Sequence, residues 1–142
     1  MANALFNTAR EGFLLGEIDW DTATIKVALV RGYTFNAAHK FMSDITTASG
    51  IVHATSAALA GKTGTSGTAD ATDITFSAVA ADATAHVLIV FQSSAVAGGA
   101  DVASTAQRVI AYLDTGTLLP ITPNGGDIIV AWDNNTNKIF TL

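Results

Sequence analysis

The chain has 142 residues, enough for one domain with a real hydrophobic core, and nothing in it suggests a second domain. It has no cysteine, which excludes disulfides and thiolate metal sites, and its net charge of -5 argues against binding to phosphate backbones. Charged residues make up 13% of the chain, where about 25% is usual, so the surface is poorly protected against association. We expect one domain over residues 1–142, no nucleic-acid partner, and a protein that works inside an assembly. A β-rich domain simply coated with threonine is the alternative.

Export and membrane signals are not visible in the sequence. No apolar run approaches the roughly 18 residues that a membrane span needs, and the N-terminus lacks a basic stretch followed by an apolar block. We therefore expect a soluble chain without a membrane partner, which stays in the compartment where it is made.

The first predicted element is an amphipathic helix over about residues 4–15. Asn3 is placed to cap its start, and Gly16 can adopt the left-handed conformation at its end. A helix of this length is not stable alone. We therefore expect its apolar stripe to lie on the domain's own sheet or on a neighbouring subunit. The stripe comprises Leu5, Phe6, Ala9, Phe13 and Leu14.

The middle of the chain is typical of strands and turns. Residues 25–30 alternate between an apolar and a mixed face, which predicts a strand. Residues 36–45 predict a short helical turn anchored by its central Phe-Met pair. Residues 50–63 and 69–79 are expected to be extended, joined by the turn TGTSGT, whose two glycines can adopt positive φ.

The second half of the chain contains two runs that are apolar on both faces, at 86–91 and 108–113, as expected for strands buried on both sides. Between them lies a long segment of low charge with the pair Gly98-Gly99, which predicts an exposed loop that serves as a contact arm. From residue 118 onward, a strand, a Pro-Asn-Gly-Gly turn, a second strand and a last turn predict a β-meander. The expected fold is mainly β, an antiparallel sandwich or flattened barrel of about 7–8 strands with a short N-terminal α-helix.

One triplet, Gly61-Lys62-Thr63, resembles the end of a phosphate-binding loop. The glycine that opens such a loop is replaced by Ser56, and no apolar residues at helical spacing follow the triplet. Asp114, after an apolar run, is weak evidence for a magnesium site because Asp is common where a buried strand ends. We expect the triplet to close a strand of a β-hairpin and to bind no nucleotide.

Candidate catalytic and metal-binding residues are sparse. The three histidines, His39, His53 and His86, are far apart and show no ligand spacing; folding could still gather them around zinc, but surface or strand-edge positions are the ordinary explanation. No serine lies in a nucleophile-elbow motif, and pairs such as Asp19 with Asp21 are more typical of turns. We therefore predict no enzyme activity, no cofactor and no metal, and keep a small hydrolase as a remote alternative.

The two tryptophans are expected to differ. Trp132 continues a strand alternation and is predicted to be core, whereas Trp20 stands between two aspartates and is the better candidate for exposure. An exposed indole on a β-sandwich can stack on a sugar ring. Trp20 is thus the glycan-contact candidate.

Three stretches together carry a family resemblance: MANALFNTAREGFLLGEIDWDTATIKVALV at the start, AALAGKT with ADATDITFSAV in the middle, and LPITPNGGDIIVAWDNNTNKIF at the end. They resemble small virion structural proteins of tailed bacteriophages, over nearly the whole chain except the loops at 31–50 and 93–106. The resemblance implies a structural part of the particle and brings no catalytic residues with it.

Within that family, we expect a capsid decoration or cement protein, a homo-oligomer bound to the major capsid protein shell and assembled with the virion in the host cytoplasm. The alternative is a tail, baseplate or fibre component that touches other tail proteins and host glycan. Many modest apolar contacts, each contributing about 25 cal/mol per Å² buried, can together strengthen a shell. The expected contact residues are Phe6, Phe13, Leu14, Gly98 and Gly99.

Overall fold

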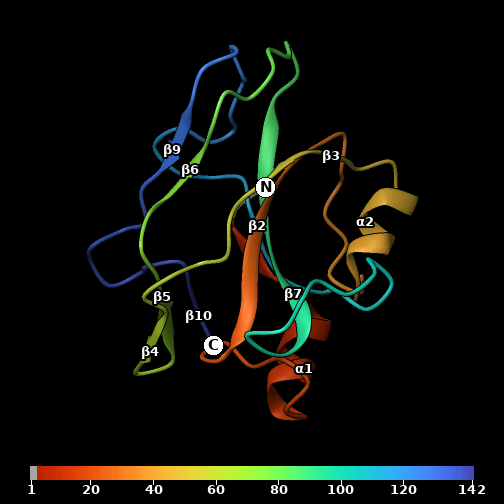
Figure 1. Ribbon diagram of the computed structural model, residues 1–142, viewed down its shortest axis with the longest axis vertical. Helices are drawn as coiled ribbons and strands as arrows, with labels where there is room; N and C mark the ends of the chain where they lie inside the picture. Colours follow the sequence, from red (N-terminus) through yellow and green to blue (C-terminus); the bar gives the residue numbers. More distant parts are fainter. Residues whose placement is uncertain (1–2) are drawn as a thin grey trace.

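A five-stranded antiparallel sheet forms the centre of the computed structural model, which describes residues 3–142. The strand order is β1-β8-β7-β2-β3, so strands far apart in the sequence are neighbours. β2 and β7 run side by side through the middle of Figure 1. The mainly β, antiparallel prediction with a short N-terminal helix is confirmed. The strands are β1 (Ala4–Leu5), β2 (Ala23–Arg31), β3 (Ile51–Thr55), β7 (His86–Ala97) and β8 (Arg108–Leu113).

Two smaller antiparallel sheets lie to the left of β2 and β7 in Figure 1. One has the order β10-β5-β4 and the other pairs β6 with β9. Because β9 pairs with β6 and β10 with β5, the predicted C-terminal meander is wrong: these strands return to partners more than 50 residues earlier. Their bounds are β4 (Thr63–Thr65), β5 (Thr68–Asp70), β6 (Ile74–Phe76), β9 (Ile128–Val130) and β10 (Phe140–Thr141).

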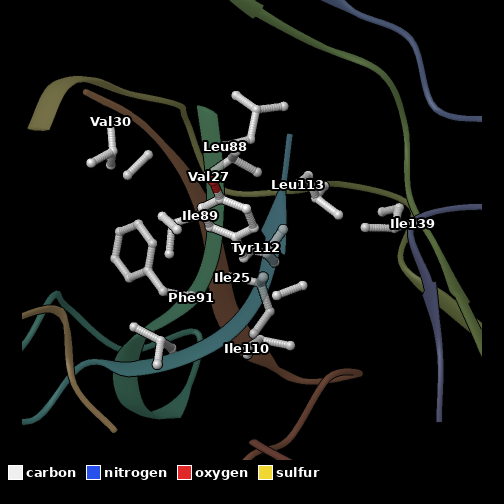
Figure 2. Close-up of a cluster of buried hydrophobic side chains, with 14 of the residues drawn as sticks. Ile25, Val27, Val30, Leu88, Ile89, Phe91, Ile110, Tyr112, Leu113 and Ile139 are labelled. Carbon is white, nitrogen blue, oxygen red and sulfur yellow. The ribbon is translucent and has the colours of Figure 1, made fainter. Parts of the chain in front are cut away.

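Both faces of β8 and of the first half of β7 are largely buried, as the apolar runs predicted, whereas the edge strand β3 is partly exposed. Every residue of β8 is buried. On one face the ring of Tyr112 lies 5.1 Å from that of Phe35, in the connection after β2. On the other face, Leu88 and Leu113 line the same hollow as Ile139 from the C-terminal segment, and Figure 2 shows Ile139 beyond Leu113. The sheet is thus covered on both sides by segments of its own chain.

The N-terminal helix α1 (Asn7–Leu14) is shorter than the predicted 4–15, because residues 4 and 5 form β1 instead. Asn3 does not cap the helix; its Oδ1 accepts the backbone N–H groups of Asp114 and Thr115. Gly16, with φ of +72°, lies in the left-handed region just after the helix, as predicted.

The second helix, α2 (Met42–Thr47), lies on the right of the central strands in Figure 1 and begins later than the predicted turn at 36–45. The Asp44 carboxylate accepts the N–H groups of Lys40 and Phe41 at 2.8 and 2.9 Å, which closes the start of the helix. The hydrogen bond from Phe41 is the main cause that lowers the pKa of Asp44. Both helices are short: the longer one, α1, has 8 residues, and within residues 3–142 no helix has the length and apolar content of a membrane span.

The Gly-Lys-Thr triplet lies at a β-hairpin, as predicted. We expected it to end a strand, but it stands at the start of strand β4. The turn to β5 is tighter than expected, with Ser66 and Gly67 both at positive φ, as a type I′ hairpin turn requires. The Lys62 ammonium donates to the backbone carbonyl of Ala23 at 3.1 Å. Within residues 3–142, strands and no helix follow the triplet, so it lacks the N–H groups of a helix N-terminus that bind a phosphate in such a loop.

The predicted loop between the two central apolar runs begins later than expected, because β7 continues to residue 97. Ser93 and Ser94 in this extension are buried, and the Ser94 hydroxyl donates to the Val96 carbonyl at 2.8 Å. Hydrogen bonding of buried hydroxyls to the backbone allows this polar stretch to continue a strand.

Candidate functional site

The predicted contact stripe of α1 is divided between the core and the surface. Phe6 is completely buried, with its ring 5.0 Å from that of Phe35, so the prediction that it contacts a partner is wrong. Phe13 is partly buried beside Phe140. Leu14 is 87% exposed and its neighbour Leu15 is 63% exposed. The available apolar surface of α1 is therefore its C-terminal end.

The Gly98-Gly99 turn lies at the surface, as predicted for an arm. Gly98 is exposed with φ of +60°, and the space where a side chain would begin is open, with no atom within 4 Å. Gly99 is half-buried, with its N–H bonded to the Val96 carbonyl. Val96 beside them is 65% exposed. Whether this turn contacts a partner stays a prediction.

Trp20 is a core residue, so the prediction of an exposed sugar platform is wrong. Only 8% of it is exposed, its indole N–H donates to the Thr63 carbonyl at 2.9 Å, and its ring meets Phe140 edge-on at 5.1 Å. The missed signal was the alternation of apolar Ile18 and Trp20 with acidic residues at 17, 19 and 21, which is typical of a segment with one buried face. Trp132 is buried as predicted, and its indole N–H donates to the Thr72 carbonyl.

A second apolar surface surrounds a hollow of about 620 Å³ on the side of the C-terminal strands. Its floor includes Leu88 and Leu113 of the central sheet, and its lining includes Leu118 and Ile129, which are 66% and 61% exposed. Single exposed apolar side chains are ordinary, but Leu118 and Ile129 line the same hollow, and apolar side chains that gather in one patch are typical of surfaces that meet another molecule.

A polar cluster lies at one end of the central sheet, where His53, Asp82 and His86 come together. Each offers one ligand atom, and the three atoms lie within 4.8 Å of one another. The two imidazole rings meet edge-on at 4.8 Å. The prediction of surface or strand-edge histidines holds for His53 on the edge strand β3 but is wrong for His86, which has no exposed surface. His39 lies elsewhere, bonded to the Tyr33 hydroxyl.

The backbone fixes the position of each histidine. His86 opens β7, where it pairs with Arg31 of β2 and, on its other side, forms a bridge with Ile121. His53 lies at a β-bulge: β2 residues Leu29 and Val30 pair with residues 54 and 52, which leaves His53 without an opposite residue. Bulges re-aim side chains and are frequent next to functional sites.

Hydrogen bonds to carbonyl groups determine which nitrogen of each imidazole carries the proton. His53 Nε2 lies 3.0 Å from the Ala80 carbonyl, and His86 Nδ1 lies 2.7 Å from the Thr84 carbonyl. A carbonyl only accepts, so both of these nitrogens are protonated in the neutral rings. The bare nitrogens, Nδ1 of His53 and Nε2 of His86, then lie 3.8 and 3.9 Å from Asp82 Oδ2.

Asp82 is held in this position from both sides. Its Oδ1 accepts the Thr84 N–H at 2.8 Å, which is the main cause that lowers the pKa of Asp82, and Arg31 donates toward Oδ2 at 3.0 Å. The carboxylate is thus ionised under ordinary conditions. Two bare imidazole nitrogens and a carboxylate oxygen form a set of Lewis bases that could hold a transition-metal ion.

The sequence contained only part of this cluster. Asp82 and His86 are four residues apart, but His53 lies on a strand that reaches them only through the pairing of β3 with β2 and of β2 with β7. Comparison with family models, curated proteins and solved structures finds no significant match for this chain. Function is therefore inferred from the residues and their geometry.

Proposed function

We propose that this chain is a non-enzymatic structural protein of a bacteriophage virion, a decoration or cement protein that stabilises the shell of the major capsid protein. The observation that carries the proposal is the exposure of Leu14 and Leu15 at the end of α1, although other apolar residues of that helix, Ala9 and Phe13, pack on the protein's own core. Such leucines lose exposed apolar area when a partner covers them, at about 25 cal/mol per Å².

The composition supports the same function. With charged residues at 13%, little on the surface opposes association. Further exposed apolar side chains lie elsewhere on the molecule, so one copy can contact more than one neighbour. Many copies with modest contacts give a large total stabilisation by avidity. These residues are Ile51, Val52, Val96, Leu118, Ile129 and Leu142.

The double variant Leu14→Asp/Leu15→Asp is expected to lose binding to particles produced without the chain. Two carboxylates at the contact must be desolvated on docking, so occupancy at a fixed protein concentration should fall at least about 10-fold. Occupancy is measured by quantitative gel densitometry after the particles are separated from free protein. The fold should remain intact, because both side chains are exposed.

Glu11→Ala, at an exposed position of the same helix, is the matched control and should bind as the unmodified chain does. Wild-type occupancy of the double variant would contradict the role of this helix end.

A tail, baseplate or fibre component is the second candidate function, with the same kind of apolar contacts to tail proteins. The exposed arm at Gly98 suits either position in a particle. Binding of host glycan through Trp20 is no longer part of this candidate, because that indole is buried and hydrogen-bonded.

A further inference from the structure

We propose that His53, Asp82 and His86 form a zinc site, with Nδ1 of His53, Oδ2 of Asp82 and Nε2 of His86 as the three protein ligands. This inference is independent of the proposed structural function and needs neither a particle nor a partner. Three converging Lewis bases, one of them buried and unsatisfied, carry it.

The buried nitrogen of His86 is the strongest observation. His86 has no exposed surface, and within residues 3–142 no hydrogen-bond partner lies within reach of its Nε2. A buried polar atom without a partner destabilises the fold, and this one lies 3.9 Å from Oδ2 of Asp82. A bound cation would take the lone pair of this nitrogen, for which the described residues offer no hydrogen-bond donor.

The outer contacts are those that a metal site needs. Metal-ligating imidazoles usually donate their other N–H to a carbonyl or carboxylate, which fixes the ring and leaves the ligating nitrogen bare. His53 does so to Ala80 and His86 to Thr84. The remaining oxygen of Asp82 accepts the Thr84 N–H, so all three ligands have an outer partner.

The spacing of the three atoms is close to that of a zinc site. Bonds of about 2.0–2.1 Å to tetrahedral zinc place ligand atoms roughly 3.4 Å apart. The two distances to Asp82, 3.8 and 3.9 Å, are slightly longer, and all three atoms lie within 4.8 Å of one another, so metal binding requires the ligands to move closer together. Two nitrogens and one oxygen suit Zn²⁺ better than Ca²⁺ or Mg²⁺, which prefer oxygen ligands. Three protein ligands leave a fourth position open for water or another group.

Arg31 opposes a cation at this site. Its guanidinium lies 3.0 Å from the same carboxylate oxygen, and its side chain is 35% exposed. The guanidinium therefore competes with the metal for Asp82 and can turn toward solvent when the metal binds. Removal of this competitor should tighten zinc binding, by roughly fivefold for an ion pair of about 1 kcal/mol.

The experiment titrates the untagged full chain with zinc chloride by calorimetry and records thermal unfolding with and without the metal. We expect one equivalent of Zn²⁺ to bind and a 100-fold excess over Kd to raise Tm by roughly 5–10 °C. EDTA should reverse the shift.

Cobalt chloride as a probe should give the visible absorption bands of a four-coordinate site. Long-range ¹H–¹⁵N spectra should report metal on Nδ1 of His53 and on Nε2 of His86.

Variants test the assignment of the ligands. His53→Ala should abolish the Tm shift while the chain stays folded, because this ring is near the edge of the sheet. Asp82→Asn should weaken binding at least about 10-fold, and Arg31→Gln should strengthen it. His39→Ala is the control and should leave binding unchanged. The proposal is overturned by the absence of zinc binding, by wild-type binding in His53→Ala, by loss of binding in His39→Ala, or by weaker binding in Arg31→Gln.

Discussion

Replacing Trp20 by alanine is expected to lower the free energy of unfolding by about 3–5 kcal/mol, the usual cost of truncating a buried tryptophan. The indole is almost fully buried, packs edge-on against Phe140 and donates a hydrogen bond to the Thr63 carbonyl. It therefore joins the segment before β2 to two of the small-sheet strands, β4 and β10. Denaturant unfolding monitored by circular dichroism measures the change.

Two other variants separate this explanation from a role of Trp20 at the surface. Trp20→Phe keeps most of the buried area and loses the hydrogen bond, so it should cost roughly 1–2 kcal/mol. Leu14→Ala, at an exposed position, should change stability by no more than about 0.5 kcal/mol. A Trp20→Ala protein as stable as the unmodified chain would contradict the placement of the indole in the core.

Replacing Arg108 by alanine is expected to cost about 2–4 kcal/mol, because the guanidinium is buried and its hydrogen bonds connect three segments. Arg108 is only 5% exposed at the start of β8; it donates to Glu17 and to the Thr8 carbonyl of α1, and it lies over the ring of Phe41. Glu17 is 43% exposed and screened by solvent, so most of the loss comes from the helix carbonyl and from packing. Denaturant unfolding again gives the change.

Arg10→Ala is the matched control, since Arg10 is an exposed arginine on α1 whose guanidinium donates to the side chain of Asn7. It should change the free energy of unfolding by no more than about 0.5 kcal/mol. Arg108→Met should cost less than Arg108→Ala, because methionine keeps apolar contacts along the side chain. Equal and small effects for Arg108→Ala and Arg10→Ala would show that the buried guanidinium does not hold α1 to the sheet.

The parts of the fold that local pattern predicts are the central ones. Residues 108–113 are apolar without interruption, and this alone indicates a strand buried on both faces. Gly16 likewise indicates the end of α1, because the left-handed conformation there favours glycine. Strand pairing is different: β9 pairs with β6 and β10 with β5, and a turn next to a strand does not identify its partner when the partner is distant in the sequence.

The candidate sites were less predictable for the same physical reason. Burial of Trp20 depends on Phe140 at the other end of the chain, and its two aspartate neighbours suggested exposure. The histidine cluster depends on two strand pairings and a bulge that re-aims His53. Of the three α1 residues predicted as contacts, Leu14 is exposed, Phe13 is partly buried and Phe6 is fully buried, because the helix stripe alone does not show how much of it the protein's own core covers.

We propose that the chain is a structural component present in many copies, which acts through apolar contacts with neighbouring subunits. The measurement that tests this most directly is the copy number of the chain in purified virions, determined by quantitative gel densitometry against the major capsid protein. We expect hundreds of copies per particle, so that the molar ratio of the chain to the major capsid protein is close to a simple fraction. A stoichiometry far below that of the major capsid protein, or no chain in the particle, would contradict it.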